Sequence, residues 1–212
     1  KLVGIKLKGR LSGWTASKDI ILKVATMLTV KGGTGKIVEY FGEGARSLSA
    51  TGKGTVTNMG AEIGATTSTF GYDEEMDPYL RATDRTLIAD LCKKYAPHLQ
   101  SDPEVEADPE KFYDEYHEID LDQLEPHIVG PHTPDLGRPI SAMASEVDEK
   151  GYPEELSSAL IGSCTNSSYE DMSRSVSLVR QAKASGIKVK SNFLVTPGSE
   201  QIYETIKQDG IL

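Results

Sequence analysis

The stretch Ile161-Gly-Ser-Cys-Thr-Asn-Ser-Ser-Tyr-Glu-Asp-Met172 joins an apolar segment to a segment with helical character. Residues 158–161 are predicted to form a strand that leads into this stretch, and residues 167–184 a helix that leads out of it. A second strand over residues 187–195 and a second helix over residues 198–208 follow. This β-α-β-α order predicts a parallel sheet covered by helices.

Cys164 lies in the turn between the first of these strands and its helix, among small polar residues. In open α/β sheets, ligands bind outside the carboxyl ends of the strands. Ser167 and Glu170 fit a capping box, so the helix amino terminus is expected to point toward the turn. Backbone N–H groups at that position favour an anion and lower the pKa of a thiol.

The residues around Cys164 leave its role open. A nucleophilic cysteine usually needs a nearby base such as histidine, and no histidine is close to it in the sequence. A metal site needs further cysteines, and the chain has only one other, Cys92. A thiolate nucleophile, a metal-bound thiolate and an inert turn cysteine therefore all fit the physics of the turn.

Composition restricts the class of protein. The chain has 212 residues with 38% hydrophobic and 26% charged residues, which is an ordinary balance for a folded domain. A formal net charge of −9 argues against nucleic acid as the main partner. No apolar stretch is long enough for a membrane span, and no signal peptide is expected at the first residues. Two cysteines do not make a disulfide framework, which favours a reducing compartment.

The amino-terminal part of the chain predicts a β-α-β unit. A strand is expected over residues 3–7, a helix capped by Ser17, and a strand over residues 36–41. The intervening Lys31-Gly-Gly-Thr-Gly-Lys36 lacks the spacing of a phosphate-binding loop, so we interpret it as a helix-to-strand turn.

Asn58-Met-Gly-Ala-Glu-Ile-Gly-Ala65 is a second segment of interest. If it is helical, Asn58 and Glu62 lie four residues apart on one face. Two glycines within a helix cost about 1 kcal/mol each relative to alanine, so such a helix suggests tight packing or close approach to a ligand. The plainer alternatives are a helix cap for Asn58 and a surface carboxylate for Glu62.

The middle of the chain carries fewer signals. A helix is predicted to start at Asp77-Pro78, and Cys92 is predicted to be core filler in a later apolar stripe. An exposed connection is expected over residues 101–116, followed by a strand over residues 118–121. The four histidines form no metal-binding pair and are interpreted as structural or surface residues; they are His98, His117, His127 and His132.

A segment rich in proline and glycine between residues 126 and 139 is the candidate domain junction. It divides the chain into a complete α/β domain over residues 1–125 and the first part of a second α/β domain over residues 126–212.

Several motifs resemble those of the iron–sulfur hydro-lyases, the family of aconitase, homoaconitase and isopropylmalate dehydratase. The motifs occur in the family's order along nearly the whole chain, and the residues after Asn166 look like mitochondrial-type aconitase. They are Val30-Lys-Gly-Gly-Thr-Gly35, Asn58-Met-Gly-Ala-Glu-Ile-Gly-Ala-Thr-Thr-Ser68, Gly130-Pro-His-Thr-Pro-Asp-Leu136, Ile161-Gly-Ser-Cys-Thr-Asn166 and Thr196-Pro-Gly-Ser-Glu-Gln-Ile202.

The resemblance implies a truncated three-layer α/β/α fold with mostly parallel sheets, covering the family's second domain and part of its third. It implies that Cys164 is one of three thiolate ligands of a 4Fe–4S cluster, the other two forming a Cys-x-x-Cys pair further downstream. Glu62 matches a family carboxylate that handles the hydroxyl or water proton, and Asn58 matches a residue lining that site. Thr57 departs from the family, where many members have a cysteine that is not a cluster ligand.

The resemblance also implies a function. The parent enzyme is expected to convert citrate to isocitrate through cis-aconitate, as a monomer in the mitochondrial matrix. Homoaconitate hydration is the alternative substrate class, and a hydrolase with a cysteine nucleophile is a distant one. The catalytic serine base and the substrate-binding arginines of the family are not matched here, so the isolated chain is predicted to be inactive.

Overall fold

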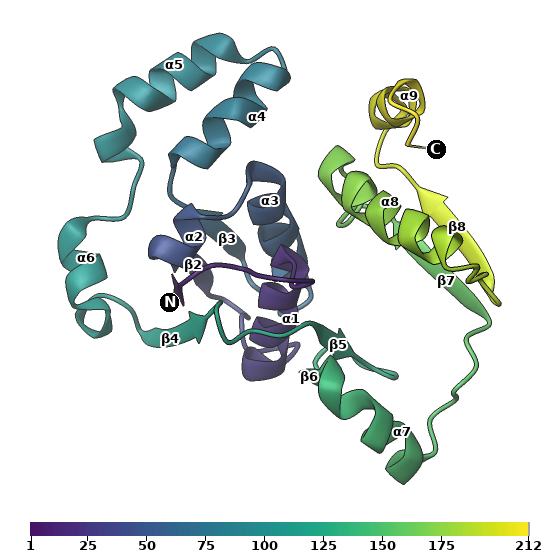
Figure 1. The fold of residues 1–212 in the computed structure, drawn as a ribbon. Helices are drawn as coiled ribbons and strands as arrows, with labels where there is room; N and C mark the ends of the chain where they lie inside the picture. Colours follow the sequence, from purple (N-terminus) through teal and green to yellow (C-terminus); the bar gives the residue numbers. More distant parts are fainter. Residues whose placement is uncertain (212) are drawn as a thin grey trace. The chain divides into compact units, whose positions relative to one another are not determined.

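The computed structural model describes residues 1–211, which form two compact units, one over Lys1–Glu146 and one that begins at Val147 (Figure 1). The division falls within helix α7 (Met143–Lys150), later than the proline-rich junction. Residues 126–146 therefore belong to the first unit rather than the second. Strands β5 (His127–Val129) and β6 (Gly137–Pro139) of this segment pack on helix α1 (Ser17–Leu28) of the first unit. The assignment of the two parts to the family's second and third domains stays a prediction.

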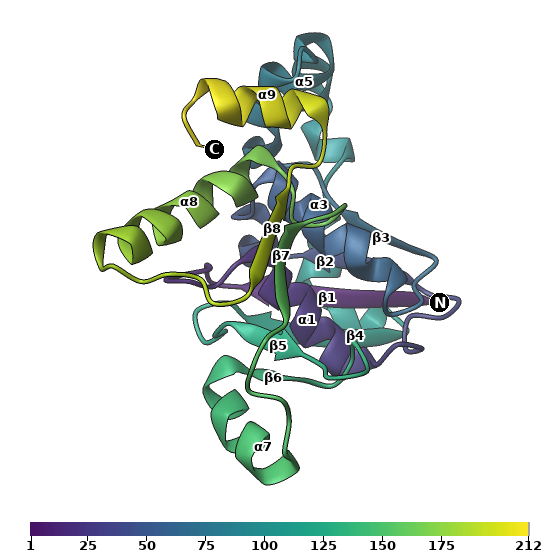
Figure 2. The ribbon, with the colours of Figure 1, turned by 90° about the vertical axis from the view of Figure 1, so that its right-hand side faces the viewer.

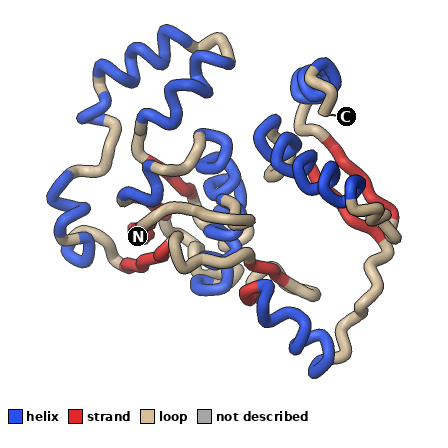
Figure 3. The backbone as a smooth tube through the Cα atoms, viewed as in Figure 1, coloured by secondary structure: helices blue, strands red, loops and turns tan. Residues whose placement is uncertain are grey.

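A four-stranded sheet forms the centre of the first unit, in the order β3-β2-β1-β4, and its neighbouring strands are all parallel. Figure 3 shows these strands among the helices that flank them. The α/β class with mostly parallel strands is therefore confirmed. The strands are β1 (Leu2–Lys8), β2 (Ile37–Phe41), β3 (Thr67–Phe70) and β4 (Glu115–Asp120).

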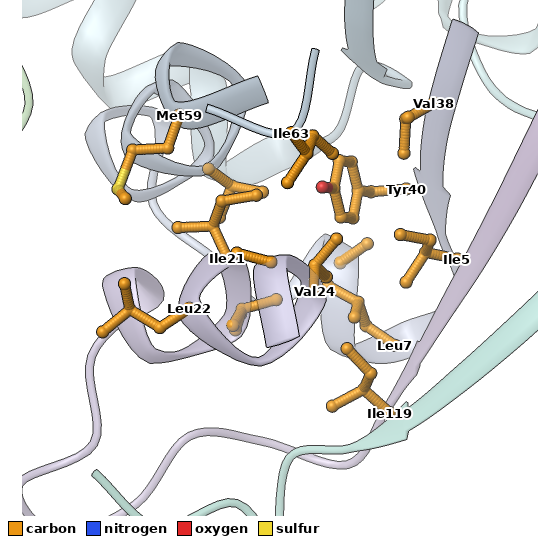
Figure 4. Close-up of a cluster of buried hydrophobic side chains, with 14 of the residues drawn as sticks. Ile5, Leu7, Ile21, Leu22, Val24, Val38, Tyr40, Met59, Ile63 and Ile119 are labelled. Atoms are coloured by element: carbon orange, nitrogen blue, oxygen red, sulfur yellow. The ribbon is translucent and has the colours of Figure 1, made fainter. Parts of the chain in front are cut away.

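The core lies between one face of this sheet and helix α1. Val3, Ile5 and Leu7 alternate along β1 and are fully buried, as the period of a strand requires. The facing stripe of α1 contributes side chains at helical spacing, and Figure 4 shows the two sets interleaved. Each buried valine, leucine or isoleucine side chain among them stabilises the fold by about 1.5–3 kcal/mol. The stripe includes Ile20, Ile21, Val24, Ala25 and Leu28.

Helix α1 starts one residue earlier than predicted. Ala16, not Ser17, is the N-cap residue, and its backbone N–H donates to the Asp19 carboxylate at 2.7 Å. The other Asp19 oxygen accepts from the backbone N–H of His127 at 2.8 Å. One buried carboxylate thus joins the first turn of α1 to β5 and explains why an alanine can occupy the cap position.

The rest of the first unit is mostly helical. β5 and β6 form an antiparallel pair within the segment predicted to be irregular. The expected connection over residues 101–116 contains a short helix and the buried Tyr113, and β4 begins three residues earlier than predicted. The remaining helices are α2 (Glu43–Arg46), α3 (Ala50–Asn58), α4 (Asp77–Ala82), α5 (Thr86–Lys94) and α6 (Pro103–Ala107).

Helix α5 does not bury its apolar stripe, contrary to the sequence prediction. Cys92 is only half-buried, and the residue of α5 that is fully buried is Ala89. Helix α5 contacts α4 and places its larger apolar side chains outward. The exposed ones are Leu87, Ile88 and Leu91, with Tyr95 just beyond the helix.

The second unit has the predicted β-α-β-α order. Strands β7 (Ser158–Gly162) and β8 (Asn192–Thr196) are parallel, and helix α8 (Tyr169–Ala184) connects them along the chain (Figure 2). Helix α9 (Glu200–Gln208) contacts α8. Across residues 1–211, no helix combines the length and apolar character that a bilayer crossing requires.

Candidate functional site

Cys164 lies in the turn that follows β7 and precedes α8, as predicted. Because β7 and β8 are parallel, their carboxyl ends meet at this edge, and Gly162 pairs with Thr196 there. The Cys164 side chain is exposed and forms no disulfide. The turn therefore presents a thiol to a ligand at the position where open α/β sheets bind theirs.

Hydroxyl groups flank the Cys164 sulfur. Its Sγ lies 4.0 Å from Ser163 Oγ and 3.7 Å from Thr165 Oγ1. The Ser163 hydroxyl is the donor in its contact, and a hydrogen bond donated to sulfur favours the thiolate over the thiol. The thiolate is the form that attacks electrophiles and binds metals.

The backbone before Cys164 adopts an uncommon conformation. Gly162 has a φ of 143° and Ser163 a φ of 70°. A serine in the left-handed region is strained, and such strain concentrates at functional sites. The Ser163 N–H donates to Thr196 Oγ1 at 3.1 Å, which joins the turn to the end of β8.

The capping box of α8 lies one residue later than predicted. Ser168 and Asp171 form it, rather than Ser167 and Glu170, and Ser168 Oγ accepts from the Asp171 N–H at 3.2 Å. Asn166 Nδ2 also donates to Asp171, at 3.2 Å. The amino terminus of α8 nevertheless follows the Cys164 turn directly, so the positive end of the helix dipole favours negative charge nearby.

Ser167 has a packing role instead. It is buried, and its carbonyl oxygen accepts from the Gly198 N–H at 3.0 Å. A Cβ at Gly198 would lie 2.5 Å from Ser167 Oγ, so glycine is needed for this close approach. The loop after β8 therefore packs directly beneath the Cys164 turn.

Asn58 and Glu62 lie four residues apart at the carboxyl end of α3, although their helix differs from the prediction. Helix α3 begins at Ala50, behind the N-cap Ser49, and ends at Asn58. A 3-10 turn over Met59–Ala61 continues it, and Glu62 caps that turn with helical backbone angles. Both candidate side chains are exposed.

The buried residues between them anchor this end of α3. Met59 and Gly60 are buried, and a Cβ at Gly60 would lie 2.4 Å from Ser68 Oγ. The glycine that seemed costly in a helix is thus explained by packing against β3. The buried Met59 and Gly60 fix the backbone that carries Asn58 and Glu62. The side chains of Asn58 and Glu62 are exposed and can contact a ligand from solvent.

The candidate residues fall into two groups. Asn58 and Glu62 belong to the first compact unit and Cys164 to the second. The contacts that position each group of residues lie within its own unit.

Within residues 1–211, no cluster of three or more histidine, cysteine or acidic side chains is arranged to hold a metal ion. Cys164 by itself has the properties of a single thiolate ligand, because it is exposed and flanked by hydroxyls. The side chains of this chain therefore fit one ligand of an iron–sulfur cluster rather than a complete site.

His117 and His127 have local partners. His117 Nε2 lies 2.8 Å from Glu115 Oε1, and His127 Nδ1 lies 2.7 Å from the Glu125 carbonyl oxygen. These contacts agree with the structural or surface role predicted for them.

Two residues that matter for the Cys164 turn were missed by the sequence reasoning. Thr196 and Asp171 hold its two ends, and each contact joins residues whose pairing depends on the fold. Thr196 begins one of the sequence motifs, just after a predicted strand, and this position could have marked it as a functional residue. Nothing in the sequence, however, predicts its hydrogen bond with Ser163.

Comparison with known proteins decides the family. A model of the aconitase family, described as aconitate hydratase, matches residues 1–212. The chain belongs to the aconitase family. Membership of this family implies an iron–sulfur cluster, which agrees with the exposed thiol of the Cys164 turn.

Individual members of the aconitase family resemble the chain along its whole length. It is 58% identical to the mitochondrial aconitate hydratase of Gracilaria gracilis, over all of this chain and 26% of the relative. It is 57% identical to those of Schizosaccharomyces pombe and Saccharomyces cerevisiae, again over all of this chain and 26% and 27% of the relatives. The chain thus spans about a quarter of the length of these relatives.

Proposed function

We propose that this chain is part of an aconitate hydratase and contributes one cluster ligand and one acid–base group to its active site. The observation that carries the proposal is the exposed Cys164 on its strained turn, in a chain similar throughout to mitochondrial aconitate hydratases. On this proposal the protein acts in the mitochondrial matrix as a monomer on citrate, cis-aconitate and isocitrate.

Cys164 would hold one iron of a 4Fe–4S cluster, and two further thiolates would come from the rest of the parent protein. When bound, the cluster would supply an iron with open positions that acts as a Lewis acid toward the substrate hydroxyl. The Ser163 hydroxyl, which donates to the Cys164 sulfur, would favour the thiolate form that binds metal. The start of α8 favours negative charge at the same place.

Glu62 would carry the proton of the departing or entering water. In dehydration, its carboxylic acid form would donate a proton to the substrate hydroxyl, which leaves as water, while a base from the rest of the parent protein removes the neighbouring C–H proton and that electron pair forms the C=C bond. In hydration, its carboxylate would accept a proton from water as the C–O bond forms, and the conjugate acid of that base returns the proton to the neighbouring carbon. A positioned group of this kind contributes about 10²- to 10⁴-fold to the rate. Asn58, one turn earlier, would bind the substrate or the water by hydrogen bonds and fix its orientation.

The test is turnover of the full-length protein, measured as formation of cis-aconitate from citrate and from isocitrate. Glu62→Gln should lower kcat by about 100-fold or more while the protein keeps its cluster, because the amide cannot transfer the proton. Glu104→Gln, a change at an exposed carboxylate on α6, serves as the matched control and should leave kcat unchanged.

Several outcomes would contradict the proposal. Wild-type protein that turns over only the longer homoaconitate substrates would assign the chain to homoaconitate hydration. Ester hydrolysis that depends on Cys164 without a cluster would assign it to nucleophilic catalysis. The isolated chain is predicted to show no turnover, since one thiolate does not hold a four-iron cluster; measurable conversion of citrate by it would refute that part.

A further inference from the structure

The proposed function does not explain what holds the Gly162–Ser163 backbone in its conformation. Ser163 adopts a φ of 70°, which disfavours a residue with a side chain. Such a conformation persists only where its surroundings hold it in place. Cys164 follows directly, so the angle at Ser163 sets the direction in which the thiol leaves the turn.

Thr196 makes the contact that holds this backbone. Its Oγ1 accepts from the Ser163 N–H at 3.1 Å. A Cβ at Gly162 would lie 2.0 Å from the same oxygen and 2.4 Å from the Thr196 carbonyl oxygen. Glycine at position 162 is therefore required for the Thr196 side chain to reach the turn.

The other end of the turn is fixed separately. Asn166 donates to Asp171 at 3.2 Å, and the Ser168 N–H donates to the same side chain at 3.1 Å. Asp171 belongs to the first turn of α8, whereas Thr196 is the last residue of β8. The thiol thus lies between one anchor on the helix and one on the neighbouring strand.

We infer that Thr196 is a positioning residue for Cys164. Its hydroxyl holds the strained Gly162–Ser163 backbone so that the thiolate points toward the cluster and remains there. The inference rests on the proposed function, because it assigns Cys164 as a cluster ligand. Thr196 itself touches neither the iron nor the substrate in this role.

The experiment compares full-length wild-type protein with Thr196→Val and Thr196→Ser after anaerobic reconstitution with iron and sulfide. The readout is the rate of cluster loss to a chelator, followed by the visible absorption of iron–thiolate charge transfer. Valine keeps the shape of threonine and removes the acceptor, so cluster loss should be about fivefold faster, the effect of losing one ordinary hydrogen bond. Serine keeps the acceptor and should restore the wild-type rate.

A second readout needs no cluster. In the apoprotein, the alkylation rate of Cys164 is measured by peptide mass spectrometry, with Cys92 as the internal reference. Thr196→Val should change the Cys164 rate and leave the Cys92 rate unchanged, because only the turn is released. A general loss of structure would change both rates and would overturn the positioning role.

The outcomes separate this inference from the function it rests on. Wild-type protein that takes up no cluster would overturn both. Wild-type protein that binds a cluster, together with equal rates for wild type and Thr196→Val, would overturn the inference alone. Equal impairment in the valine and serine variants would do the same. If the valine variant does not fold, the rates of cluster loss of Thr196→Ala and Thr196→Ser are compared instead. Both side chains are smaller than threonine, and they differ in the hydroxyl, so equal rates would overturn the inference.

Discussion

A buried ion pair fixes the helix that leads to Asn58 and Glu62. Lys53 Nζ, on α3, lies 2.9 Å from Asp73 Oδ1 and 2.8 Å from Asp73 Oδ2. The two side chains are 4% and 7% exposed, so water contributes little to either charge. Lys53 also donates to the Leu48 carbonyl oxygen. Removing one partner therefore leaves an uncompensated charge in the interior.

Lys53→Met removes the positive charge and keeps most of the side-chain volume. Breaking a buried pair from one side costs about 3 kcal/mol or more, since the remaining carboxylate is desolvated and unpaired. The cost should appear as easier local opening of α3, measured by hydrogen exchange of its amides in the full-length protein. A change of about 3 kcal/mol corresponds to roughly 150-fold faster exchange.

Two further variants test the reasoning. Lys53→Met combined with Asp73→Asn removes both charges and should recover about half of the lost free energy. Arg81→Met breaks a solvent-exposed pair with Asp77 and should leave exchange of α3 unchanged. Exchange in Lys53→Met within about threefold of wild type would refute the claim that this pair anchors α3.

Other predictions concern the packing of the first unit. Asp19→Ala removes a buried acceptor of two backbone N–H groups and should cost about 2 kcal/mol, seen as roughly 30-fold faster hydrogen exchange at the start of β5; unchanged exchange there would contradict the role given to it. Gly4→Ala places a Cβ 2.4 Å from the Tyr113 ring and should cost about 1–3 kcal/mol, measured as a lower thermal midpoint; an equal or higher midpoint would show that the ring moves freely. The ammonium of Lys36 beside Glu115 lowers the pKa of that carboxyl, so its stabilising effect is complete above the ordinary glutamate pKa and is lost as pH falls through the folded value. The urea midpoint of wild type should therefore fall between pH 7 and pH 3 by more than that of Glu115→Gln. An equal fall in the two proteins would argue against this ion pair.

The sequence predicted the parts of the fold that depend on local patterns. Alternation along β1 and the apolar stripe of α1 are short-range periodicities, and both elements were found where expected. The turn around Cys164 was also predicted, because small polar residues separate an apolar strand from a helix. The segment containing Asn58 and Glu62 was recognised, but its helix was placed too late, because α3 begins at Ala50 and ends at Asn58.

The remaining details depend on contacts that no short pattern contains. Ser167 and Ser168 each precede an acidic residue at capping distance, and only the packing of Ser167 against Gly198 decides between them. The stripe on α5 has the period of a buried face, yet Ala89 is the residue that α5 buries. The bond from Ser163 to Thr196 joins residues 33 positions apart and exists only once β7 and β8 are paired.

The most direct test of the central claim is the iron and sulfide content of the full-length protein with Cys164→Ser, purified without oxygen and compared with wild type and Cys92→Ser. If Cys164 is a cluster ligand, wild type and the Cys92 variant should carry equal amounts of iron and sulfide, with the same visible spectrum. The Cys164 variant should carry almost none. A Cys164 variant that retains the full cluster would contradict the account.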